Sequence, residues 1–150
     1  MPVNQFTPLN LSTQKQRGFS LIELMMVLAV IGLLVSVAIP KYQNYLTKAA
    51  LNTTLAQASS EKINVEVYIN ENGQFPDALA APVPFNQGEI NYQAKEQGAG
   101  DIIASITSGA AQGSQLYLSR ENTGQWSCVV HASSDFATAL PKSCQLDALQ

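Results

Sequence analysis

The sequence has very little of the chemistry on which enzymes depend. It holds a single histidine, His131, and two cysteines, Cys128 and Cys144, whose spacing is not that of a CxxC pair. It contains no phosphate-binding loop, dinucleotide fingerprint, HExxH helix or GxSxG elbow. One histidine among scattered carboxylates gives no convincing general acid and base pair. The sequence therefore predicts a protein that is not an enzyme, with no catalytic residue, no metal site and no cofactor.

Positive charge is also scarce. Lys15 and Arg17 precede Phe19, so six basic side chains stand against eleven acidic ones from Phe19 onward, which gives that part a net charge of −5. A surface of that sign repels phosphate backbones and disfavours non-specific binding of nucleic acid. A host surface or DNA is thus a partner that the charge does not support. The net charge does not exclude a local basic patch around Lys95, Arg120 or Lys142.

Apolar residues make up 46% of the chain, and many of them lie in one run from Phe19 to Ile39. As a helix these residues measure about 31 Å, the hydrocarbon thickness of a bilayer. The basic residues just before the run predict that its N-terminal side stays in the cytoplasm and that the remainder of the chain is exported. Glu23 is out of place in this run, because a lone carboxylate there costs about 2–4 kcal/mol.

Glu23 requires a partner that the run itself does not supply, since no basic side chain lies between Phe19 and Ile39. Another chain could provide one, and so could a new terminal amine on Phe19 after cleavage behind Gly18. Two other interpretations stay open. The small residues Ser36-Val37-Ala38 fit the outline of an ordinary secretory signal peptide, whose removal would release a soluble protein. A simple single-span anchor also fits the length of the run but leaves Glu23 unexplained.

The residues from Gly18 to Gly32, GFSLIELMMVLAVIG, resemble the class III signal sequence of type IV pilins and the related pseudopilins. The resemblance implies that a prepilin peptidase cuts between Gly18 and Phe19 and that Phe19 is then N-methylated. It also implies that Glu23 acts in assembly by pairing with the terminal amine of a neighbouring subunit. The leader, residues 1–18, is longer than is usual for pilins with an N-terminal phenylalanine.

Gly32 and Pro40 fall where type IV pilins often carry a glycine and a proline, and both residues disfavour a regular helix. The resemblance implies that residues 32–40 can be helical in the subunit and extended in the fibre. A kink at Pro40 alone is the simpler expectation for an isolated subunit.

After Pro40, apolar residues recur at steps of three and four and predict an amphipathic helix that packs on a sheet and continues to about Asn72. Gly73 then supplies a stop signal. An unbroken helix over 19–72 would measure about 80 Å, so its apolar half is expected to protrude from the folded domain. The predicted packing stripe consists of Tyr42, Tyr45, Leu46, Ala49, Leu51, Leu55, Ala58, Ile63 and Val67.

Proline and glycine punctuate the next segment, residues 73–100, and predict a surface loop. Strands are predicted at residues 90–95, 101–107, 115–120 and 125–131, which would form an antiparallel meander laid on the second half of the helix. The predicted fold is therefore α+β, with one long N-terminal helix and an antiparallel sheet of about four strands, as in type IV pilins.

The two cysteines of an exported chain favour a disulfide. The segments Trp126-Ser127-Cys128 and Leu140 to Cys144 resemble the C-terminal disulfide region of type IVa pilins. Closing the ring from Cys128 to Cys144 would stabilise the fold by about 3 kcal/mol. The simplest interpretation of the bond is structural, and His131 and Trp126 are interpreted as sheet residues.

The chain is thus divided into a leader (1–18), a transmembrane and assembly helix (19–40), the amphipathic half of the helix (41–72), a loop (73–100) and a sheet with the disulfide region (101–150). Its expected function is that of a pilus subunit, polymerised into a surface fibre for adhesion, twitching motility or DNA uptake. A secretion pseudopilin and a minor or competence pilin are the alternatives. The expected partners are copies of itself, the prepilin peptidase, the assembly machinery and the inner membrane of a Gram-negative bacterium, from which the subunit passes into the extracellular pilus.

Overall fold

The computed structural model describes residues 18–77 and 82–148. The predicted leader therefore lies outside the described residues except for Gly18, and so do Lys15 and Arg17. The chain forms two compact units, Met1–Val37 and Ala38–Gln150. Helix α1 (Leu21–Asn72) belongs to both units, and the other helices and strands of the described residues belong to the second.

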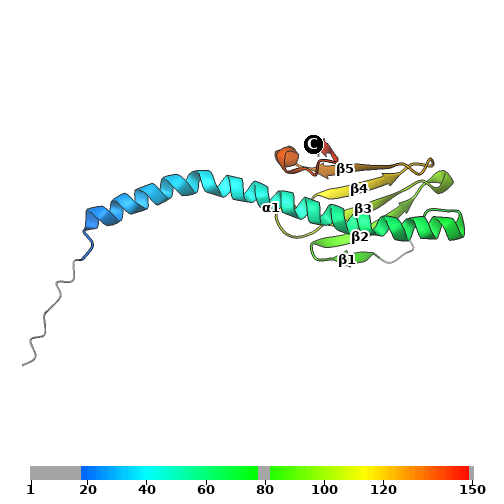
Figure 1. Ribbon diagram of the computed structural model, residues 1–150, viewed down its shortest axis with the longest axis horizontal. Coiled ribbons are helices and arrows are strands. Elements are labelled where there is room, and N and C mark those ends of the chain that lie inside the picture. The colour runs from blue at the N-terminus through cyan, green and yellow to red at the C-terminus, as the bar shows by residue number, and fades with distance from the viewer. Residues whose placement is uncertain (1–17, 78–81, 149–150) are drawn as a thin grey trace, which may run out of the picture. The chain divides into compact units, whose positions relative to one another are not determined.

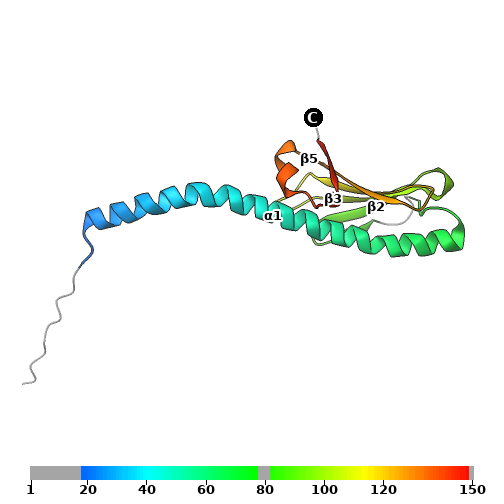
Figure 2. The ribbon, with the colours of Figure 1, turned by 45° about the horizontal axis from the view of Figure 1, so that its top comes forward.

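The second unit combines the C-terminal part of α1 with a six-stranded sheet in the order β1-β2-β3-β4-β5-β6. The strands are β1 (Val83–Phe85), β2 (Gly88–Ala94), β3 (Gly100–Ile106), β4 (Gln115–Arg120), β5 (Trp126–Ala132) and β6 (Gln145–Ala148). Two short 3-10 helices, η1 (Glu96–Gly98) and η2 (Ser134–Ala139), precede β3 and β6. Figures 1 and 2 show the strands side by side, with this part of α1 lying along one face of the sheet.

The predicted class is correct, and the predicted sheet of about four strands is wrong in two respects. The sheet has two more strands, β1 and β6, one at each edge. Strand β6 also pairs with β5 in parallel, with Val129 opposite Gln145, whereas all other pairs are antiparallel. Both missed strands are short, and β1 contains Pro84, which is tolerated because an edge strand has a side that needs no hydrogen bond donor.

The core lies between α1 and the inner face of the sheet. From the helix it takes small and medium side chains, which let the helix approach the strands closely. From the sheet it takes alternate residues of each central strand, as expected when one face of a sheet is covered. The largest fully buried apolar side chains are Leu51, Val65, Ile90, Ile102, Leu116, Leu118 and Val130.

The predicted packing stripe on α1 is only partly correct. Leu51 and Ala58 are buried, but Tyr42, Tyr45 and Ile63 are 63%, 70% and 70% exposed. The buried face is instead defined by Thr47, Ala50, Leu51, Thr54, Ala58 and Val65. Apolar periodicity did not predict this face because two of its members are threonines, which are classed as polar residues.

Two glycines have a clear structural reason. Gly73 has φ of 74° and follows the last residue of α1, so it ends the helix as predicted. Gly100 begins β3 directly under the ring of Phe75, which is 2% exposed, and a Cβ at this position would overlap that ring. The second glycine thus makes room for the aromatic side chain that closes one end of the core.

Candidate assembly site and the unit that carries it

In the first unit, the side chains of helix α1 are not covered by any other described part of the chain. All fifteen large apolar side chains from Phe19 to Ile39 are exposed, from 87% for Phe19 to 42% for Val35. The helix contains an 18-residue window apolar enough to cross a membrane, and none of that window is buried. Length and composition alone give this result, which a signal sequence would also satisfy. The exposed apolar surface is nevertheless too large to remain in water unless lipid or another chain covers it.

Glu23 has a partner that the sequence interpretation missed. The backbone N–H of Ser20 donates a hydrogen bond of 2.9 Å to Oε2 of Glu23, and α1 begins between them at Leu21. Ser20 thus occupies the N-cap and Glu23 the third helical position, which is half of a capping box. The carboxylate also lies at the positive end of the helix dipole. The sequence contains the motif for this cap, because Ser-x-x-Glu before an apolar run is typical of a helix N-terminus.

Gly18 and Phe19, the predicted processing residues, precede this cap and are exposed. A Cβ on Gly18 would meet no atom within 4 Å. The Gly18-Phe19 peptide bond therefore lies outside regular secondary structure, where the backbone is open to an enzyme.

Gly32 and Pro40 both lie inside the continuous helix α1. A Cβ on Gly32 would meet no neighbouring atom within 4 Å, so packing does not explain this glycine. Pro40 has no N–H to donate to the carbonyl of Ser36, four residues earlier. The Ser36 hydroxyl in turn donates a hydrogen bond of 2.7 Å to the carbonyl oxygen of Leu33. Residues 32–40 are thus helical but hold one hydrogen bond fewer than a regular helix.

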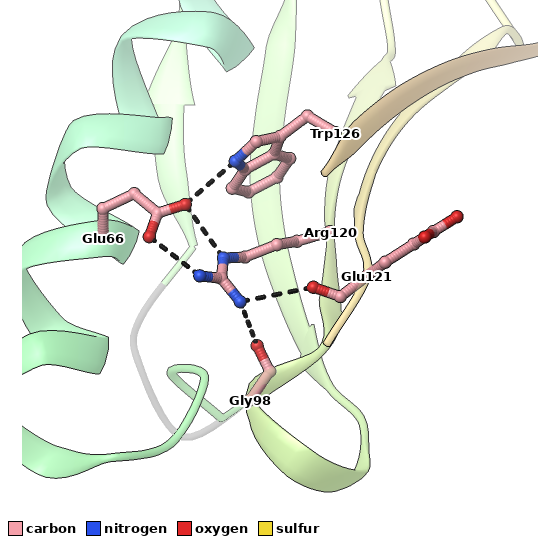
Figure 3. A network of polar contacts seen from close by, with 5 residues as sticks. All are labelled: Glu66, Gly98, Arg120, Glu121 and Trp126. Carbon is pink, nitrogen blue, oxygen red and sulfur yellow. Dashed lines mark hydrogen bonds and ion pairs between the residues drawn. The ribbon is translucent and has the colours of Figure 1, made fainter. Parts of the chain in front are cut away.

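In the second unit, α1 is fixed to the sheet by a network around Glu66 (Figure 3). The guanidinium of Arg120, at the end of β4, donates from Nε to Oε1 of Glu66 at 2.8 Å and from Nη2 to Oε2 at 3.0 Å. The indole N–H of Trp126 donates to the same carboxylate at 2.9 Å. Nη1 of Arg120 donates to the carbonyl oxygens of Gly98 at 3.0 Å and Glu121 at 3.3 Å.

The network couples charge, an aromatic ring and loop backbone at one end of the sheet. Hydrogen bonds from Arg120 hold the pKa of Glu66 below its ordinary value, although partial burial acts in the opposite direction. The ammonium of Lys62, one helical turn earlier, lies 5.1 Å from the centre of the Trp126 ring, within reach of a cation–π contact. Burial lowers the pKa of Lys62. Together these groups set the position of α1 on β4 and β5.

A second tether lies nearer the middle of the helix. The hydroxyl of Tyr92 on β2 donates a hydrogen bond of 2.7 Å to Oε2 of Glu61. Burial, with the hydrogen bond to Glu61, raises the pKa of Tyr92, so the phenol stays protonated. Three of the charged residues of this part of α1, Glu61, Lys62 and Glu66, are therefore directed toward the sheet.

The two cysteines are joined as predicted. The disulfide Cys128–Cys144 connects β5 to the segment just before β6, across a separation of 16 residues. Nδ1 of His131 lies 3.2 Å from a carboxylate oxygen of Asp147, its register partner on β6. His131 and Trp126 both belong to β5, so their interpretation as sheet residues is correct. The C-terminal strand is thus held by a covalent bond and by the contact between His131 and Asp147 beside it.

Two of the three residues of the possible basic patch are already paired. Nζ of Lys95 lies 2.7 Å from a carboxylate oxygen of Asp101, and Arg120 is bound to Glu66. Within residues 18–77 and 82–148, no group of three or more His, Cys, Asp or Glu side chains could hold a metal ion.

Comparison with protein families agrees with this geometry. A model described as the prokaryotic N-terminal methylation motif matches residues 13–39, and one described as pilin (bacterial filament) matches residues 47–145. The second match covers more than half of the chain, including most of the sheet and the disulfide.

The chain belongs to the type IV pilin family.

Relatives of this pilin include subunits of bacterial fimbriae. It is 33% identical over 135 residues to a type IV major pilin protein of Neisseria gonorrhoeae, covering 80% of this chain and 74% of that protein. It is 30% identical over 132 residues to a fimbrial protein of Pseudomonas aeruginosa, covering 77% and 86%. It is 28% identical over 162 residues to a probable minor fimbrial protein of Dichelobacter nodosus, covering 90% and 98%. The pilin is accordingly a structural protein and not an enzyme.

Proposed function

We propose that this pilin is cut between Gly18 and Phe19 by a prepilin peptidase, methylated on Phe19 and polymerised into a surface fibre. The observation that carries this proposal is the uncovered apolar helix from Phe19 to Ile39. The methylation motif supports it, because the matched residues, 13–39, include the proposed cleavage bond. In this scheme the segments 1–18, 19–40, 41–72, 73–100 and 101–150 serve as leader, assembly helix, packing helix, surface loop and sheet.

Two environments cover the apolar helix in turn. In the precursor it spans the inner membrane once, with the second unit outside. In the fibre it is covered by the same helix of neighbouring subunits, and burial of each large side chain contributes about 1.5–3 kcal/mol relative to water. The partners in this scheme are the peptidase, the assembly machinery and other copies of the chain.

Glu23 acts in both states. In the subunit its carboxylate caps the helix through the N–H of Ser20. In the fibre the same carboxylate pairs with the new amine on Phe19 of a neighbour, which is needed because a charge placed among apolar helices is costly when it has no partner. Ser20 satisfies only one of the two carboxylate oxygens, so the other remains available to the neighbouring subunit.

Residues from Gly32 to Pro40 unwind when the fibre forms. The segment already lacks the hydrogen bond that Pro40 cannot donate, and Gly32 lowers helix propensity by about 1 kcal/mol relative to alanine. Unwinding there lengthens the chain between the apolar part and the second unit, since extended residues advance about 3.3 Å each against 1.5 Å in a helix.

Among the proposed roles of the fibre, DNA uptake has little support from the charges. Two of the three candidate basic residues are neutralised by carboxylates, which leaves Lys142 alone. A secretion pseudopilin or a minor pilin would share the same assembly helix. Electron microscopy of sheared surface filaments labelled for this chain distinguishes a major pilin from a minor pilin or a pseudopilin. For a major pilin, the label should cover the whole length of the fibre.

Processing is tested by mass spectrometry of the exported protein, which we expect to begin at methylated Phe19. A chain that starts at Ile39, after an ordinary signal cleavage, would refute the proposal, and so would an uncut Met1.

The role of Glu23 is tested with two variants. Glu23→Gln keeps a side-chain acceptor for the helix cap but loses the charge, whereas Glu23→Ala loses both. We expect both variants to be cleaved and both to assemble poorly if charge pairing between subunits is required. Normal fibres from Glu23→Gln together with defective fibres from Glu23→Ala would assign the residue to capping alone.

A further inference from the structure

Four exposed residues lie just after the apolar segment, on the part of α1 that belongs to the second unit. They are Lys41, Tyr42, Tyr45 and Lys48, here called the Tyr-Lys face. At 100° per residue all four fall within an arc of about 120° on one side of the helix. Tyr42 and Tyr45 are 63% and 70% exposed, values that are high for tyrosine rings.

The opposite side of the same helical turns is the one that contacts the sheet domain. Thr47, Ala50 and Leu51 are buried, and the hydroxyl of Thr47 donates a hydrogen bond of 3.3 Å to the carbonyl oxygen of Ala110. The Tyr-Lys face is therefore directed away from the sheet of its own unit. The fold leaves it uncovered, so the two rings are free to contact an environment outside the unit.

The charges on this face also lack a partner in the described part of the chain. Between Glu23 and Glu61 the helix carries no acidic residue, and its charged side chains there are Lys41 and Lys48 alone. No carboxylate oxygen of the described residues lies within 4.0 Å of either lysine nitrogen, since the ion pairs there involve Lys95, Arg120 and His131. Both ammonium groups are therefore free to bind a partner that carries negative charge.

We propose that the Tyr-Lys face lies in the headgroup layer on the outer side of the bilayer while the precursor is anchored there, with both lysines bound to anionic phospholipid. This inference rests on the single-span precursor proposed above. Along the helix, Lys41 lies about 3 Å beyond Ile39 and Lys48 about 13 Å beyond it, so the side chain of Lys48 must reach back toward the bilayer. The headgroup region occupies roughly 5–8 Å on each side of the hydrocarbon core.

Side-chain direction brings all four groups into that layer. Long side chains on a helix lean toward its N-terminus, here toward the hydrocarbon core, so Tyr45 and Lys48 reach back by about one turn. Tyrosine rings favour the membrane interface because one end is apolar and the other hydrogen-bonds to water. The lysine stems can lie along the rings while the ammonium groups reach lipid phosphates. The face thereby fixes the depth of the span.

Fluorescence quenching in vesicles of the full-length precursor tests this placement. Three tryptophan variants, Val30→Trp, Tyr45→Trp and Ala56→Trp, are compared with the parent protein, whose Trp126 gives a common background. Phosphatidylcholine brominated either deep in its chains or near the headgroup is the probe. We expect deep bromine to quench Val30→Trp most and shallow bromine to quench Tyr45→Trp most. Ala56→Trp, about 16 Å farther along the helix, should lose no emission.

The lysines are tested in the same vesicles with a minority of phosphatidylglycerol as the only brominated lipid. Quenching of Tyr45→Trp should then exceed that produced by the same fraction of brominated phosphatidylcholine. The added changes Lys41→Gln and Lys48→Gln should abolish this excess.

Each contrary result has a distinct meaning. Quenching of Val30→Trp without quenching of Tyr45→Trp would overturn the Tyr-Lys face proposal alone. No quenching of Val30→Trp would overturn the membrane precursor as well. If the emission of Tyr45→Trp changes when the protein is diluted with more lipid, the Tyr-Lys face contacts a second copy of the chain. Equal quenching by the two brominated lipids would refute the role of the lysines.

Discussion

The network around Glu66 makes the sharpest prediction about stability. Replacing Glu66 with alanine removes three hydrogen bonds, two from Arg120 and one from Trp126. The side chain of Arg120 is only 12% exposed and retains bonds to the carbonyl oxygens of Gly98 and Glu121, whereas the indole N–H of Trp126 loses its partner. Hydrogen bonds to charged groups contribute about 1.5–3 kcal/mol each when buried.

That value must be reduced here because the Glu66 side chain is 38% exposed and solvent screens its charge. We therefore expect Glu66→Ala to lower the free energy of unfolding by about 2–3 kcal/mol in total. Glu66→Gln keeps acceptors for Trp126 and Arg120 but loses the charge, so it should cost about 1–2 kcal/mol. The matched control is Glu71→Ala, an exposed carboxylate on the same helix, which should change stability by less than about 0.5 kcal/mol.

The assay is denaturant unfolding of the full-length protein in detergent micelles, followed by the emission of Trp126, the single tryptophan of the chain. Because folding lowers the pKa of Glu66 below its ordinary value of 4.5, the stabilisation is fully present above pH 4.5 and is lost as the pH falls through the lowered value. The difference between wild type and Glu66→Ala should thus shrink in acid. A variant as stable as the control, or a difference that is the same at pH 7 and pH 3, would refute this account of the network.

Three further changes test other parts of the fold by the same unfolding measurement. Gly100→Ala should destabilise by about 1–3 kcal/mol because its Cβ overlaps the ring of Phe75, and unchanged stability would show that the ring can move aside. Thr54→Val should be neutral or stabilising by about 1 kcal/mol, because the buried Thr54 hydroxyl has no hydrogen bond partner among the described residues; a loss of stability would reveal an unseen partner. Replacing Cys128 and Cys144 with serine should cost about 3 kcal/mol and speed hydrogen exchange in β6, and unchanged exchange there would mean that backbone pairing alone holds the strand.

Features that depend on neighbouring residues were predictable from the sequence. The long helix, its end at Gly73 and the four central strands follow from periodicity and turn residues read in short windows. The cap formed by Ser20 and Glu23 belongs to the same class, since its motif spans only four residues. The cost of a lone carboxylate in an apolar run points to a partner on another chain, whereas the backbone N–H of Ser20, three residues away, already supplies one.

Features that depend on register were not predictable. Glu66 and Arg120 are 54 residues apart, and nothing local marks them as a pair. The two edge strands are too short to show a period, and the parallel pairing of β6 depends on where the chain returns after η2. The buried face of α1 was misassigned for a related reason. Both threonines on it contact a surface that exists only once the sheet has formed.

The strict chain order of the sheet has a kinetic consequence. Each strand pairs with the strand made just before it, so no pairing must wait for a distant part of the chain, and such local topologies fold fast. In the export that we propose, a domain of this kind can assemble step by step as it emerges from the membrane, starting on helix α1. In the same proposed export, Cys144 crosses the membrane after the first five strands, so the disulfide can close only when those strands have crossed. Pulse labelling of thiols during secretion would time the exit of this segment directly.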